Sequence, residues 1–192
     1  MQRVALAALV AALTVPATAS AATSTFHRFE VEATANYVVS VACPDGTTVT
    51  QRVQVTAGHE EEQQDGETLS DEDFVTVRHF GVDCEGNFFS VRASGPAEFT
   101  FSPSLQTASV TGIVTAPGGS TYTVNMTWDG TGPIESTSNT TTFTGFVGHF
   151  LGMERDAVAT GTVTVDGRTL VDGTTTSASI ETLEDTNISF GQ

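Results

Sequence analysis

The chain has 192 residues, with 7 basic and 23 acidic side chains and a formal net charge of −16 at pH 7. This length fits one domain with a continuous core. The acidic balance argues against nucleic acid as a partner, because nucleic-acid-binding proteins neutralise phosphates with basic patches. After the N-terminal segment no apolar stretch approaches the length of a membrane span, so we expect none.

The N-terminal residues have the layout of a secretory signal peptide. Arg3 precedes an apolar run over residues 4–15, which is too short to cross a bilayer, and small residues ending at Ala21 supply a cleavage site. We therefore expect residues 1–21 to be removed. Residues 22–192 are then a secreted, extracellular domain.

Apolar and polar residues alternate along most of the chain, as is typical of half-buried antiparallel strands. The first run covers residues 29–43. Fifteen extended residues span about 50 Å, so we expect a bulge or break within residues 33–36. Further runs begin at Val49, Phe74 and Phe88.

The second half of the chain continues in the same way. Its alternating runs cover residues 98–101, 109–116, 122–128, 141–147, 157–165 and 174–182. Together the runs predict about ten strands, no helix and a single antiparallel all-β domain. Two architectures fit, an up-and-down β-barrel and a meander-rich β-sandwich. The barrel is favoured because closure removes exposed strand edges.

Cys43 and Cys84 are predicted to form a disulfide bond, because oxidising conditions outside the cell let such a bond persist. Each cysteine ends a strand-like run just before a turn that contains a glycine. If the first and third strands run in the same direction, both sulfurs lie at the same end of the sheet. Two buried free thiols are the alternative.

Residues 58–73 interrupt the alternation and are interpreted as an acidic loop. Carboxylate oxygens are ligands for calcium, but the spacing of a calcium-binding loop is absent, and a dense run of like charges is typical of a solvated loop. We therefore assign no metal ligand here. The carboxylates of the segment are Glu60, Glu61, Glu62, Asp65, Glu67, Asp71, Glu72 and Asp73.

Other candidates for chemistry are sparse. No catalytic motif is present, so we assign no catalytic residue and no cofactor. Tyr122 and Trp128 share one strand face and are expected in the core rather than in a carbohydrate-stacking platform. The histidines lack a metal-binding spacing; they are His27, His59, His79 and His149.

The sequence therefore favours an exported, soluble, non-catalytic binding or structural module whose partner is a small molecule or an extracellular protein. One alternative is a secreted hydrolase acting on polysaccharide, which requires two inward-facing carboxylates about 5 to 10 Å apart. Another is a β-barrel that binds a small ligand in an apolar interior. Candidate residues for that interior are Phe29, Val39, Val53, Phe80, Tyr122 and Trp128.

Overall fold

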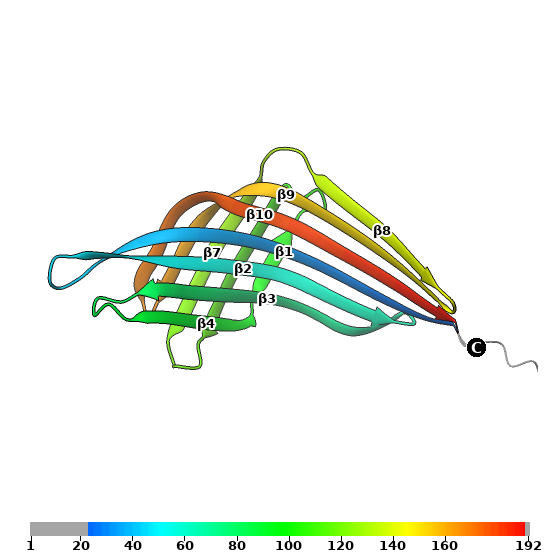
Figure 1. Cartoon of the computed structure of the whole chain (residues 1–192), viewed down its shortest axis with the longest axis horizontal. Coiled ribbons are helices and arrows are strands. Elements are labelled where there is room, and N and C mark those ends of the chain that lie inside the picture. Colours follow the sequence, from blue (N-terminus) through cyan, green and yellow to red (C-terminus); the bar gives the residue numbers. More distant parts are fainter. Residues whose placement is uncertain (1–22, 191–192) are drawn as a thin grey trace, which may run out of the picture.

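The computed structural model describes residues 23–190, so the predicted signal peptide lies outside the described residues. These residues form one antiparallel sheet of ten strands without a helix, which confirms the all-β prediction (Figure 1). The strands are β1 (Thr23–Ala42), β2 (Thr48–Gln64), β3 (Glu67–Val82), β4 (Phe88–Pro96), β5 (Glu98–Phe101), β6 (Thr107–Thr115), β7 (Thr121–Gly130), β8 (Glu135–Phe143), β9 (Phe146–Val165) and β10 (Arg168–Phe190).

The sheet is rolled but not closed into a barrel. Its strand order is β4-β3-β2-β1-β10-β9-β7-β6-β5, and β8 pairs with the first part of β9. The favoured closed barrel is therefore wrong. One chain segment supplies both ends of the order: it pairs with β3 as β4, turns at Pro96–Ala97 and pairs with β6 as β5. Because this segment passes from one edge to the other, it leaves the two edges joined by the chain instead of by a ladder of hydrogen bonds.

The rolled part of the sheet encloses the hydrophobic core. Trp128 and Tyr122 are buried there, as predicted, together with Leu105, Met126 and Ile180. The Trp128 Nε1–H group donates a hydrogen bond of 3.0 Å to the Thr34 carbonyl oxygen, which links β7 to β1 across the core. The enclosed interior is therefore filled by side chains.

One residue of the predicted interior lies elsewhere. Phe80 faces outward, opposite Arg52, because β3 directs Val77 and His79 inward and alternate residues point to opposite faces. The other candidates contact the core: Val53, Tyr122 and Trp128 are buried, while Phe29 and Val39 are partly buried against it.

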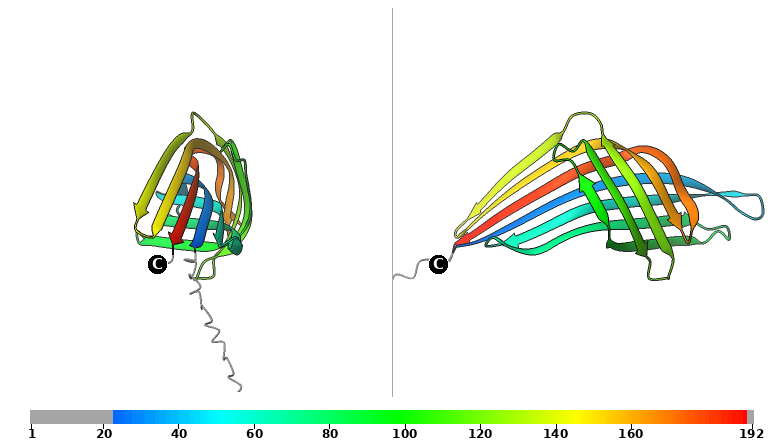
Figure 2. Two further views of the ribbon diagram at one scale, coloured as in Figure 1. Left: turned by 90° about the vertical axis from the view of Figure 1, so that its right-hand side faces the viewer. Right: turned by 180° about the vertical axis from the view of Figure 1, so that it is seen from behind.

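The long strands continue past the core and form an overhang, which we define as β8 with residues 23–30, 59–64, 67–73, 146–154 and 181–190 (Figures 1 and 2). The expected break within residues 33–36 does not occur, since β1 pairs with β2 without interruption from Phe26 to Ala42. A strand of 20 residues fits because it extends beyond the enclosed core.

Residues 58–73 form a hairpin and not a loop, which corrects the sequence interpretation. They are the end of β2 and the start of β3, joined by a tight turn at Asp65 and Gly66, both with positive φ. The Asp65 carboxylate anchors the turn by accepting a 2.7 Å hydrogen bond from the Thr25 N–H group. The hairpin accommodates its many carboxylates because alternate residues project from opposite faces, which separates neighbouring charges.

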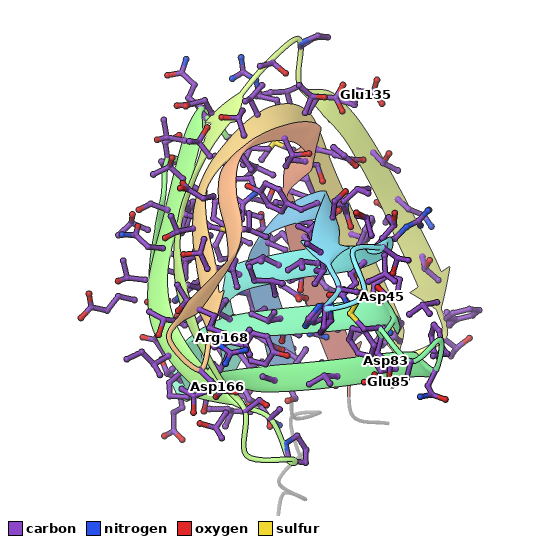
Figure 3. All side chains as sticks on the ribbon, turned by 90° about the vertical axis from the view of Figure 1, so that its left-hand side faces the viewer. Asp45, Asp83, Glu85, Glu135, Asp166 and Arg168 are labelled. Carbon is purple, nitrogen blue, oxygen red and sulfur yellow. A yellow bond between two sulfur atoms is a disulfide. The ribbon has the colours of Figure 1, made fainter. Side chains whose placement is uncertain are left out.

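The two cysteines lie at the other end of the sheet. Their Sγ atoms are 2.14 Å apart, the distance of a disulfide bond, as the sequence predicts. Strands β1 and β3 run in the same direction because both are antiparallel to β2. The turns after them are alike, and Figure 3 shows the sulfurs between Asp45 of one turn and Asp83 of the other.

Candidate functional site

The inner face of the overhang is the first candidate site, and we call it the trough. Directly opposed residues of antiparallel strands share a face, so the residues aligned with Phe29 and His27 point to the same side as the core. Strands β5 to β7 cover the core but not this region (Figure 2). The trough residues are Thr25, His27, Phe29, Glu61, Gln63, Val147, His149, Leu151, Glu184, Thr186 and Ile188.

An aromatic wall closes the end of the trough that meets the core. The Phe101 ring of β5 lies 6.2 Å from the Phe29 ring, 6.4 Å from the His59 ring and 6.0 Å from the Phe99 ring, measured between centroids. Phe29 and Phe101 remain partly buried and not fully enclosed. The wall therefore offers ring surface to the trough.

Histidine and carboxylate side chains pair beside this wall. His27 Nε2 lies 3.2 Å from Glu184 Oε1, and His59 Nδ1 lies 2.9 Å from Asp73 Oδ1. The other oxygen of Asp73 accepts a 3.2 Å hydrogen bond from the Phe99 N–H group. Asp73 thus connects β3 to β5, which gives the His59 pair a structural role.

The four histidines, which lack a metal-binding spacing in the sequence, lie at different places in the structure. His79 lies in the core, where Nε2 is 2.8 Å from Gln51 Oε1, and burial lowers the pKa of its imidazole. His149 lies in the trough away from His59. Among residues 23–190 no group of three or more His, Cys, Asp or Glu side chains is arranged to hold a metal ion.

The outer face of the overhang carries a second feature, the glutamate row. Glu135, Glu154, Glu181 and Glu32 stand directly opposite one another across β8, β9, β10 and β1. Burial, and then the nearby carboxylates of Glu30 and Glu181, raise the pKa of Glu32 to about 6. The pKa of Glu181 is also raised, by burial and then by Glu154 and Glu30.

Beside this row lies a shallow groove over β1 to β4 with a volume of about 1220 Å³. Arg28 stands near it and partly compensates the carboxylates, since its Nη2 atom is 2.7 Å from Glu60 and 3.1 Å from Glu30. The sequence did not reveal the row, because its members are distant along the chain and only the strand register aligns them.

Comparisons of the chain with protein-family models, with curated proteins and with solved structures find no match. Within residues 23–190 no helix is long and apolar enough to cross a membrane.

Proposed function

We propose that the protein is an exported, non-catalytic binding module that holds its ligand in the trough. The observation that carries this proposal is the combination of an inner sheet face that β5 to β7 leave uncovered (Figure 2), a partly exposed aromatic wall and hydrogen-bonding side chains beside it. Binding sites typically combine apolar and aromatic surface with a few placed polar groups. Extracellular location is supported by the signal-like N-terminal sequence, and the cysteine pair is compatible with it.

The chemistry of the trough favours an elongated ligand with an apolar face and hydrogen-bond donors. Phe29 and Leu151 supply apolar contacts, whereas the carboxylates of Glu61 and Glu184 accept hydrogen bonds. The net charge of −16 favours neutral or cationic ligands over anionic ones. The enclosed core, filled around Trp128, gives the small-ligand barrel alternative no comparable support.

Isothermal titration of residues 22–192 with neutral oligosaccharides and with neutral and cationic peptides tests this proposal. We compare Glu184→Gln, which alters the trough, with Glu72→Gln, which removes a carboxylate from the exposed outer face. Binding that Glu184→Gln weakens and Glu72→Gln leaves unchanged supports the trough. Equal effects of both variants, or no binding of any probe, contradict it.

A second candidate is the secreted polysaccharide hydrolase. Glu61 and Glu184 both pair with Phe29, from the strands on either side of β1, so two inward-facing carboxylates flank one residue of the trough. Two strand spacings separate their backbones by about 10 Å, near the upper limit for a pair of hydrolytic carboxylates. Release of reducing sugar from a polysaccharide, abolished by Glu61→Gln and by Glu184→Gln, would favour this function.

A further inference from the structure

Strand β8 presents an open edge of the sheet. All nine of its residues are exposed, and it pairs only with β9 among the strands that the structure describes. An edge strand offers a row of backbone N–H and C=O groups to any extended chain that comes beside it. This edge lies outside the trough.

The other free edge of the overhang is protected, whereas β8 is not. That edge is the first part of β3, residues 67–73, and it carries Glu67, Asp71, Glu72 and Asp73. Strand β8 has one charged residue, Glu135, and no proline. Its register with β9 runs without a bulge from Glu135 to Phe143. Charge, proline and bulges are the usual means of blocking an edge, so β8 is a template for strand addition.

Charge determines what kind of strand fits beside β8. The glutamate row ends at the sheet edge with Glu135, which pairs with Glu154 of β9 on its other side. A strand added to this edge therefore places one of its own side chains directly opposite the Glu135 carboxylate. Opposite charges in a cross-strand pair stabilise it and like charges destabilise it. With a net charge of −16 the protein also repels a second copy of itself.

We propose that β8 binds an extended, cationic segment of a partner protein as an added strand. The segment carries Arg or Lys opposite Glu135 and an apolar residue opposite Phe143, which lies on the same face at the other end of β8. Phe143 is 68% exposed, and its ring lies 6.4 Å from that of Phe146, so an apolar partner extends an aromatic pair. Main-chain hydrogen bonds supply the affinity and these two end positions supply the specificity. This inference does not depend on the trough.

The test uses a synthetic peptide of alternating Thr and Val with Arg aligned to Glu135 and Phe aligned to Phe143 in an antiparallel pairing. A matched peptide carries Glu in place of Arg. We expect the cationic peptide to bind at least tenfold more tightly than the acidic one in calorimetric titration. We also expect Glu135→Gln to weaken its binding about two- to fivefold, the range for one exposed charge pair.

Edge variants separate strand addition from general charge attraction. Thr137→Lys adds a repelling charge on β8, and Thr123→Lys adds the same charge on the exposed face of β7. Loss of binding with Thr137→Lys alone supports the proposal, and Glu135→Lys replaces it if Thr137→Lys does not fold. Equal effects of the β7 and β8 lysines, or no binding of the cationic peptide, overturn the proposal. A concentration-dependent dimer that Thr137→Lys disrupts also overturns it, in favour of a second copy.

Discussion

Glu32 on β1 lies directly opposite Glu181 on β10, so two carboxylates share one cross-strand position on the outer face of the sheet. Like charges directly opposite each other destabilise a strand pair. Burial raises the pKa of both carboxyl groups, and the nearby Glu181 carboxylate raises the pKa of Glu32 further. The strand register therefore imposes an electrostatic cost at neutral pH.

Glu32→Gln should relieve part of this cost. The folded-state pKa of Glu32, about 6, lies above its ordinary value of 4.5, so the folded protein retains a proton that the unfolded chain releases between these values. The charged carboxylate is thus destabilising above about pH 6, and the penalty fades as the pH falls toward 4.5. After allowance for solvent screening we expect a gain of about 1 kcal/mol at pH 7.5 and none at pH 4.5. Urea unfolding followed by Trp128 fluorescence measures it.

The difference between variant and parent isolates Glu32 from other titrating groups. Burial lowers the pKa of His79, so the unfolded chain takes up a proton that the folded protein excludes, and this destabilises both proteins as the pH falls below about 6.5. Glu72→Gln on the exposed part of β3 is the control. A stabilisation by Glu32→Gln that is the same at pH 4.5 and pH 7.5 would show that the charge of Glu32 is not its cause.

Removing the Cys43–Cys84 link should destabilise the fold. The cysteines are 41 residues apart in sequence, and closing a loop of this length stabilises a protein by about 4 kcal/mol in the chain-entropy model, with lower values common in practice. We expect the Cys43→Ala/Cys84→Ala variant to lose about 2 to 4 kcal/mol. Urea unfolding with and without a reducing agent measures the loss, and a variant that still responds to the reductant would contradict this assignment.

Trp128→Ala should be strongly destabilising. The side chain is fully buried, and replacing a buried aromatic residue by alanine typically costs about 3 to 5 kcal/mol. Trp128→Phe keeps most of the volume but leaves the Thr34 carbonyl without its indole donor, so we expect a smaller loss of about 1 to 2 kcal/mol. Unfolding followed by circular dichroism ranks the two variants. Equal losses would mean that the hydrogen bond and not the volume dominates.

Local patterns were enough to predict the strands and the cysteine pair. Alternation marks Val31, Ala33 and Tyr37 as one face of β1, and all three lie in the core. Turns that contain glycine mark the ends of the hairpins. Because β1 and β3 are both antiparallel to β2, Cys43 and Cys84 then lie at the same end of the sheet. These features depend on short-range chemistry that the sequence displays directly.

The trough and the glutamate row depend on register, which the sequence does not display. Glu61 and Glu184 are distant along the chain and meet only because β2 and β10 both pair with β1. The acidic stretch was misinterpreted for a related reason. Its composition suggests a solvated loop, yet Glu60 and Glu61 project from opposite faces of one strand, where Arg28 pairs with the first. The sequence also favoured a closed barrel, because no local sequence pattern shows that the chain crosses from one sheet edge to the other at Pro96.

Gly161 is predicted to be the position on β9 least tolerant of a methyl group. It pairs with Met126 on β7 and Gly173 on β10, and an added Cβ would lie 2.7 Å from the Met126 Cα atom and against the Asn125 carbonyl oxygen. Both contacts are with backbone, so a side-chain rotation does not relieve them. Gly161→Ala should therefore separate β7 from β9 locally and destabilise the fold by about 1 to 3 kcal/mol, the usual cost of overpacking.

Gly118→Ala, in an open turn where an added Cβ meets nothing within 4 Å, is the matched control and should change the free energy of unfolding by less than about 0.5 kcal/mol. Urea unfolding compares the two, and hydrogen exchange locates the effect. If Gly161→Ala is as stable as Gly118→Ala, the backbone of β7 does not approach β9 closely enough to exclude a methyl group at position 161.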